Sequence, residues 1–183
     1  WCATFGGSIY YETREEEEYW GTIKIVIKDT IFKNSRAKED GGAMFVHDYR
    51  SKLHKISSIE IDQSTFEGTK ANVNGGALAV IANKIKVQVN IISTKFKQCS
   101  TTTNDGGALY AKVEPSGSVE KCDVNIEKST FYSNTAASTG GAIAADKATI
   151  TLVEYSNDFV GNTAVPSTSN TISLVNDAKL LNV

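Results

Sequence analysis

A Gly-Gly-Ala-aliphatic step recurs four times along the chain and constrains its fold more than any other feature. The copies read DGGAMF from Asp40, NGGALA from Asn74, DGGALY from Asp105 and TGGAIA from Thr139. A weaker copy, GGSI, lies at 6–9, and successive glycine pairs are 31 to 35 residues apart. Such spacing indicates an internal structural repeat rather than a single loop motif.

Two further marks run in step with the glycine pairs. An alternating aliphatic pair, such as Ile25 and Ile27, ends five residues before a phenylalanine, and the phenylalanine precedes the next Gly-Gly by nine or ten residues. A spacing of two, as in TIKIVIK, indicates strands rather than helices. Paired glycines inside helices would also cost about 1 kcal/mol each relative to alanine. Each repeat therefore holds three short strands separated by turns.

Strands related by one repeat would pair in parallel and in register. The sequence predicts an all-β fold, a right-handed parallel β-helix or solenoid of about five three-strand coils of about 34 residues. We expect a single β-helix domain over 1–183. Its approximate repeats are 1–22, 23–57, 58–86, 87–122, 123–148 and 149–183.

The repeated positions then form ladders along the axis. Small polar residues two positions before each phenylalanine, such as Ser64 and Thr94, are expected to hydrogen-bond between coils. After the glycines, Met44 is expected to point inward and Phe45 outward. One glycine of each pair would take a positive φ and the other would leave room for the neighbouring coil. The predicted core ladder is Phe32, Phe66, Phe96, Phe131 and Phe159, and the predicted structural corners are Gly41, Gly42, Gly75, Gly76, Gly106, Gly107, Gly140 and Gly141.

The combination of GGA-[ILM] with F-x-x-N resembles the repeats of the chlamydial polymorphic outer membrane proteins and related pectin-lyase-like adhesin repeats. FYSN from Phe131 and FVGN from Phe159 match the second element. FKNS has its asparagine one position early, whereas FEGT and FKQC lack it. The resemblance implies a secreted or surface-exposed β-helix used for adhesion, coating or assembly. Its motifs specify coil geometry and no active site.

Composition excludes several function classes. The net charge of −2 and pI near 5.7 give no electrostatic case for nucleic acid. No apolar run approaches the roughly 18 residues of a membrane span. Cys2, Cys99 and Cys122 match no zinc pattern, and no glycine pair continues into a calcium or nucleotide motif, so neither metal nor cofactor is expected. We expect buried thiols, with a Cys99–Cys122 disulfide as the open alternative.

Many parallel β-helices process polysaccharides, which requires clustered carboxylates on one face. Asp40 and Asp105 precede Gly-Gly pairs, but Asn74 and Thr139 take that place in the other repeats. Two coils would separate the aspartates by about 10 Å. No convergent set emerges, so we expect no enzymatic activity.

Two parts of the chain do not repeat. They are the insertions between the Gly-Gly strand and the next aliphatic strand, and the two chain ends. Such places are common interaction surfaces in repeat proteins. The candidate interface residues are Trp1, Tyr10, Tyr11, Glu15, Glu16, Glu17, Glu18, Arg50, Lys52, Leu180, Leu181 and Val183.

The leading hypothesis is an extracellular or cell-surface structural protein that self-associates into a homopolymer by end-to-end stacking, forming filaments or a surface layer. The alternative is an adhesin or glycan-binding module of a larger surface protein, with a surface glycan or a protein as its ligand. A carbohydrate-active lyase or hydrolase is the third hypothesis.

Overall fold

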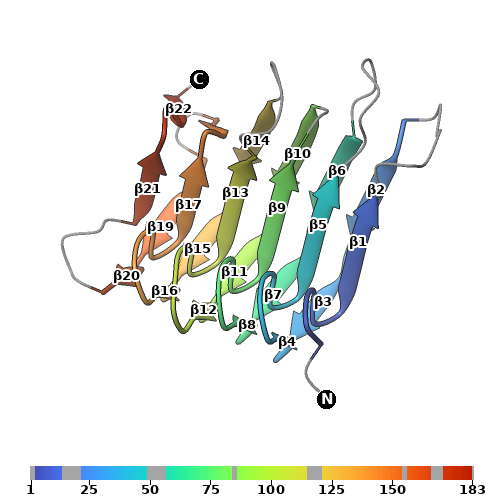
Figure 1. Ribbon diagram of the computed structural model, residues 1–183. Coiled ribbons are helices and arrows are strands. Elements are labelled where there is room, and N and C mark those ends of the chain that lie inside the picture. Colours follow the sequence, from blue (N-terminus) through green and yellow to red (C-terminus); the bar gives the residue numbers. More distant parts are fainter. Residues whose placement is uncertain are drawn as a thin grey trace.

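The computed structural model describes residues 3–13, 22–48, 57–83, 86–114, 121–153, 156–165 and 171–182. Within these ranges the chain forms strands and turns and no helix, and each strand pairs in parallel with its equivalent one coil away. Figure 1 shows the coils following one another side by side from the N-terminal to the C-terminal end. The predicted all-β parallel β-helix is confirmed.

Two six-stranded sheets form the long faces of each coil. The first, the Gly-Gly sheet, holds the five strands that follow the glycine pairs, β1 (Ile9–Thr13), β5 (Met44–Asp48), β9 (Leu78–Ala82), β13 (Leu109–Val113) and β17 (Ile143–Asp146). Its sixth strand, β21 (Ile172–Val175), continues the sheet without a glycine pair before it. The second, the aliphatic sheet, holds β2 (Lys24–Lys28), β6 (Ser57–Asp62), β10 (Val87–Ile92), β14 (Cys122–Glu127), β18 (Thr149–Leu152) and β22 (Lys179–Asn182). Both sheets are those that the repeated sequence marks predict.

Two five-stranded sheets complete the coil. The phenylalanine sheet, also predicted, contains β3 (Ile31–Lys33), β7 (Thr65–Glu67), β11 (Lys95–Lys97), β15 (Thr130–Tyr132) and β19 (Asp158–Val160). The short sheet contains β4 (Arg36–Ala37), β8 (Lys70–Ala71), β12 (Ser100–Thr101), β16 (Thr135–Ala136) and β20 (Thr163–Ala164). The short sheet is an addition to the predicted three strands per coil, because strands of two residues are too short to show an alternating pattern.

The phenylalanine ladder forms the spine of the core, as predicted. Phe66, Phe96 and Phe131 are fully buried, and Phe32 and Phe159 continue the stack at its two ends. Neighbouring rings lie 4.7 to 4.9 Å apart between centroids, with interplanar angles of 5° to 13°. The near-parallel stacking is dictated by the strand spacing, because in-register parallel strands place identical side chains directly above one another.

Polar ladders hold the corner between the aliphatic and phenylalanine sheets. The backbone N–H of Thr30 donates to Ser64 Oγ at 3.2 Å, and the N–H of Thr94 donates to Ser129 Oγ at 3.1 Å. The N–H of Ser129 in turn donates to Asn157 Oδ1 at 3.0 Å. Each small side chain thus satisfies a backbone donor of the preceding coil, which confirms the expected hydrogen bonding between coils.

A second polar ladder explains the F-x-x-N element. Asn134 is fully buried; its Oδ1 accepts from the N–H of Cys99 at 2.9 Å, and its Nδ2 donates to the carbonyl of Phe96 at 3.0 Å. Asn162 repeats this one coil later, accepting from the N–H of Asn134 and donating to the carbonyl of Phe131. Where the sequence lacks asparagine, Cys99 Sγ donates to the carbonyl of Phe66 at 3.5 Å. Asn134, Asn162 and Cys99 thus each reach a backbone group in the neighbouring coil, whereas the buried hydroxyl of the equivalent Thr69 has no hydrogen-bond partner among the described residues.

The two glycines of each pair have the two different roles that the sequence predicts. The first glycine has a positive φ, between 61° and 69° in the four full copies, which turns the chain into the following strand. The second glycine lies against the next coil: a Cβ on Gly76 would overlap the carbonyl oxygen of Gly107 and lie 2.5 Å from the nitrogen of Ser100. Gly42 and Gly107 meet the same obstruction from Gly76 and Gly141. No side chain fits at the second position.

The two described cysteines are free and belong to this core, so the alternative of a Cys99–Cys122 disulfide is wrong. Burial raises the pKa of the Cys99 thiol to about 11 and that of Cys122 to about 12. Cys2 lies outside the described residues. Buried, protonated thiols of this kind are inert towards oxidants and alkylating reagents.

Replacing the second glycine should be far more damaging than replacing a glycine that only turns the chain. Gly76→Ala overpacks the contact between two coils, and we expect it to lower the free energy of unfolding by about 3 kcal/mol or to prevent folding. Gly161→Ala is the matched control, since Gly161 has φ 64° but its Cβ would come no closer than 3.4 Å to Ser133 Oγ. The control should lose about 1 kcal/mol. Urea denaturation would measure both, and equal losses would contradict the close-approach argument.

The buried thiols should report global unfolding. In a Cys2→Ser background, we expect an aromatic disulfide reagent at pH 8 to label Cys99 and Cys122 only after denaturation. Their raised pKa values also predict that stability declines as the pH rises above about 8.5, where the unfolded thiols ionise and the native ones do not. Rapid labelling of either thiol in the native protein would refute their buried placement.

Candidate functional site

The residues that precede each glycine pair form a structural ladder rather than a catalytic cluster. Asp40 Oδ1 accepts from the N–H of Asn74 at 2.8 Å, and Asn74 Oδ1 accepts from the N–H of Asp105 at 3.2 Å. Asp105 Oδ1 then accepts from both the N–H and the hydroxyl of Thr139 at 2.9 Å. Asp, Asn and Thr occupy equivalent positions because each can bond to the neighbouring coil.

This ladder also sets the chemistry of the aspartates. Burial raises the pKa of Asp40, and the hydrogen bonds from Asn74 partly offset that effect. The paired-carboxylate arrangement that glycoside hydrolysis requires would need two such groups facing a common substrate. Asp40 and Asp105 are instead separated by the coil of Asn74 and occupied by backbone donors.

The outer side of the Gly-Gly sheet carries a second apolar cluster, which covers the outward-pointing Phe45. Phe45 has the predicted direction, opposite to the inward Met44, but is only 2% exposed. It packs against Phe5 with ring centroids 4.8 Å apart and against Tyr10 at 5.7 Å. The buried members of this outer cluster are Phe45, Ala79, Ile81, Tyr110 and Ala144. Alternation along a strand predicts the direction of a side chain but not what covers it.

Charged groups surround this outer cluster. His47 Nε2 lies 4.0 Å from Glu114 Oε2, and burial lowers the pKa of His47 while Glu114 acts in the opposite direction. Burial also raises the pKa of Tyr110, an effect that Asp146 and Asp105 reinforce. The hydroxyl of Tyr10 donates to Glu12 Oε2 at 2.7 Å. The pKa shifts of His47 and Tyr110 both favour the neutral form of the side chain, so these two groups add no charge to the outer cluster.

The described members of the predicted interface separate into three environments. Tyr10 is 49% exposed beside the outer cluster, whereas Tyr11 is partly buried and packs against the main core. Leu180 and Leu181 lie on β22 and are 42% and 46% exposed. The remaining members lie outside the described residues: Trp1, Glu15, Glu16, Glu17, Glu18, Arg50, Lys52 and Val183.

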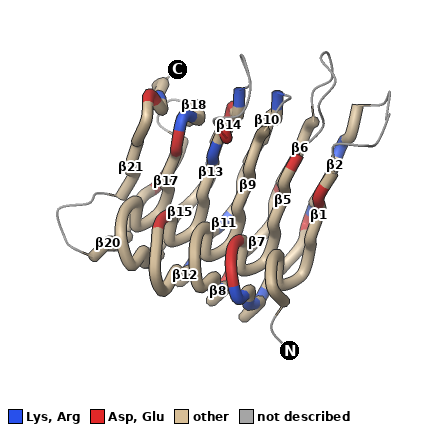
Figure 2. The backbone as a smooth tube through the Cα atoms, in the orientation of Figure 1, with Lys and Arg blue, Asp and Glu red and all other residues tan. Residues whose placement is uncertain are grey.

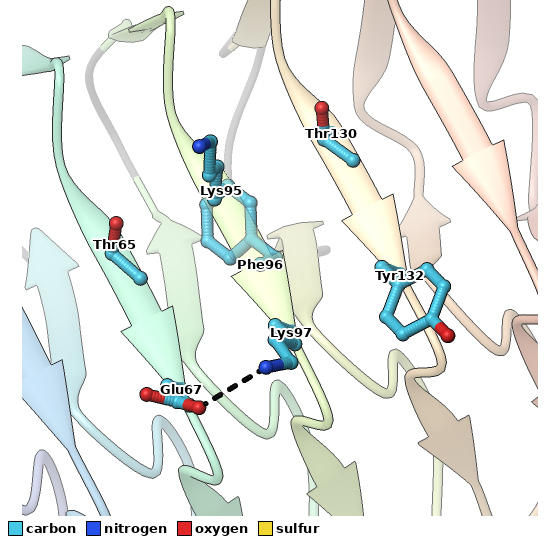
Figure 3. A pocket seen from close by; sticks show the side chains of 7 residues that line it. All are labelled: Thr65, Glu67, Lys95, Phe96, Lys97, Thr130 and Tyr132. Atoms are coloured by element: carbon cyan, nitrogen blue, oxygen red, sulfur yellow. Dashed lines mark hydrogen bonds and ion pairs between the residues drawn. The ribbon is translucent and has the colours of Figure 1, made fainter.

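A surface hollow of about 300 Å³ lies on the outer side of the phenylalanine sheet, and no motif of the sequence marks it. Figure 3 shows two rows of side chains across β7, β11 and β15. The upper row is Thr65, Lys95 and Thr130, and the lower row is Glu67, Lys97 and Tyr132, each in register across the three strands. Phe96, which points inward between the rows, contributes to the floor.

Ion pairs fix the lower row of the hollow. Glu67 accepts from Lys97 Nζ at 3.3 Å, the contact dashed in Figure 3, and its other oxygen lies 3.2 Å from Lys33 Nζ. Hydrogen bonds to Lys33 and Lys97 lower the pKa of Glu67. The aromatic ring of Tyr132 is 45% exposed at the C-terminal side of the hollow. The hollow therefore combines hydroxyl groups, ammonium groups and one accessible ring.

Over the described ranges, no helix is long and apolar enough to cross a membrane. Nor do the described His, Cys, Asp and Glu side chains gather in a group of three that could hold a metal ion.

One segment of the chain is similar to a repeat of known proteins. Residues 128–146 match the repeat of the Chlamydia polymorphic membrane proteins. This segment spans β15, β16 and β17, and it contains the stacked Phe131, the buried Asn134 and the Gly140–Gly141 corner. No curated protein and no solved structure matches the chain. The chain is thus a parallel β-helix repeat protein similar to the polymorphic membrane proteins of Chlamydia in the repeat that builds its coils.

Proposed function

We propose that this chain is an extracellular or cell-surface structural protein, a β-helical rod whose copies stack end to end. The surface location is supported by the match of residues 128–146 to a repeat of polymorphic membrane proteins. A non-enzymatic role is supported by the engagement of Asp40 and Asp105 in the ladder between coils. The two parts of the proposal, location and assembly, rest on separate observations.

The observation that carries the assembly is the exposure of apolar core positions on the last described coil. Leu180 pairs in register with Ile150, and Leu174 pairs with Ala145. Ile150 and Ala145 are 0% and 1% exposed, whereas Leu180 and Leu174 are 42% and 37% exposed. Side chains that belong to the inward ladders are covered only when another coil lies above them.

The opposite end of the rod offers matching strands. Figure 1 shows β1 and β2 at one end of the coil stack and β21 and β22 at the other. β1 and β2 are the first members of the same two sheets that end in β21 and β22, and Ile9 and Ile25 occupy their inward ladder positions. Stacking would continue both ladders, placing Ile25 of one copy over Leu180 of the next and Ile9 over Ile172. A contact between two different surfaces of identical copies does not close, so it propagates into a fibre.

Self-association should depend on concentration and on the exposed ladder residues. We expect sedimentation velocity and negative-stain electron microscopy of the wild-type protein to show rods that lengthen with protein concentration. The double variant Leu174→Lys/Leu180→Lys should stay monomeric, because charges at ladder positions cannot be buried between coils. Val160→Lys is the matched control, since Val160 is 52% exposed on β19 and points away from the core. A monomeric wild type at high concentration, or equal assembly of both variants, would refute end-to-end stacking.

A further inference from the structure

The side of the rod formed by the phenylalanine and short sheets has the opposite charge from the chain as a whole. The chain carries a net charge of −2. The outward positions of these two sheets nevertheless carry more cations than carboxylates. The cations are Lys33, Arg36, Lys70, Lys95 and Lys97, and the carboxylates are Glu67 and Asp158. We call these outward positions the basic side face.

The two other faces have the reverse balance. On the aliphatic sheet the outward carboxylates are Glu60, Asp62, Asp123 and Glu127, against Lys24, Lys28 and Lys179. On the Gly-Gly sheet, the outward Glu12 and Asp146 exceed the single lysine, Lys112. Figure 2 shows a blue segment on β11, one of the strands of the basic side face. Among the strand positions that the structure describes, the basic side face is therefore the one with a net positive charge, a distribution that directs an anionic ligand to that side.

The two lysines in the hollow of this face are not fully neutralised by carboxylates of the described chain. Lys95 is exposed, and in the described part of the chain its Nζ makes no ion pair. Lys97 shares the single carboxylate of Glu67 with Lys33, and its side chain remains 46% exposed. Figure 3 shows Lys95 and Lys97 projecting from opposite ends of β11 on either side of the hollow. An acidic group placed between the rows would meet both ammonium groups.

The neutral groups of the hollow specify the rest of the ligand. Thr65 and Thr130 flank Lys95 and present hydroxyl groups to the solvent side. Tyr132 offers an exposed ring next to Lys97 in the lower row. Hydroxyl groups exchange hydrogen bonds with sugar hydroxyls, while an aromatic face covers the apolar side of a sugar ring. The combination fits a sugar that carries a carboxylate or a sulfate.

The repeat extends this site along the rod. Arg36 and Lys70 are neighbours on successive coils of the short sheet, about 4.8 Å apart between strands. A polysaccharide with charged groups on successive sugars can contact several coils at once. Because these contacts are linked, the overall affinity exceeds that of any single contact. A nucleic acid duplex is wider than a single polysaccharide chain. Its phosphates would also approach the acidic faces of the rod, which would repel them. We infer that the basic side face binds an anionic polysaccharide along the rod axis, with one acidic sugar held in the hollow by Lys95, Lys97 and Tyr132.

Binding should be tested with the full chain on immobilised heparin and polygalacturonate, with neutral dextran and duplex DNA as comparison ligands. We expect binding to one or both acidic polysaccharides that weakens as salt rises, and none to dextran. Lys95→Gln should weaken binding about threefold, and Lys95→Gln with Lys97→Gln about tenfold. Glu67→Gln should instead strengthen binding about threefold, because it removes the carboxylate that neutralises Lys33 and Lys97.

The matched control is Lys147→Gln, which removes an exposed lysine at the turn between β17 and β18, away from the basic side face. It should bind like the wild type. Equal losses in Lys147→Gln and Lys95→Gln, weaker binding in Glu67→Gln, or no binding to either acidic polysaccharide would overturn the inference. Duplex DNA bound as tightly as the polysaccharides would overturn the choice of ligand. None of these substitutions lies on β1, β2, β21 or β22, the strands of the proposed stacking contact. The same variants should therefore assemble like the wild type, and the result of the binding test does not depend on whether end-to-end stacking occurs.

Discussion

The close contact at the second glycine of each pair is the constraint on which the rest of the structure depends. A Cβ at Gly42, Gly76 or Gly107 would overlap the glycine carbonyl of the next coil, so the backbones can approach only without side chains there. This approach holds successive coils in one register. The same register places the phenylalanine rings 4.7 to 4.9 Å apart and brings Asn134 within reach of Cys99 and Phe96. Stacking, hydrogen bonding and core packing therefore share one geometric origin.

The fold was largely predictable because this geometry repeats. A turning glycine and a clearance glycine occur in five coils, and an inward phenylalanine occurs five times, so the sequence shows the same requirement repeatedly. The short sheet was not predictable, because its strands hold two residues and only Ala or Thr points inward, as at Ala71 and Thr101. The burial of Phe45 was also missed. Its direction follows from alternation, but its cover by Phe5 and Tyr10 comes from a segment that does not repeat.

The hollow on the phenylalanine sheet could not be predicted, because the residues that line it do not repeat from coil to coil. Its rows combine different residues at equivalent positions: Thr65, Lys95 and Thr130 in one, and Glu67, Lys97 and Tyr132 in the other. Nothing in the sequence marks such a row until the strands are placed in register. By contrast, Asp40 and Asp105 look chemically significant in the sequence. Because Asn74 accepts a backbone hydrogen bond from an equivalent position, just as Asp40 and Asp105 do, the structure explains both aspartates as ladder members.

Inward positions of this fold therefore tolerate fewer substitutions than outward positions. A change at a clearance glycine or a stacked phenylalanine alters the spacing of two coils, and the cost spreads to every ladder that shares this spacing. A change at Lys95 or Tyr132 alters only the surface, since the flanking Phe96 and Phe131 hold the strands in place. The β-helix can thus keep its core fixed while the rows on its side vary in charge and shape. Differences between coils are therefore concentrated in the outward rows, where Thr65, Lys95 and Thr130 take equivalent positions, while the inward ladders repeat.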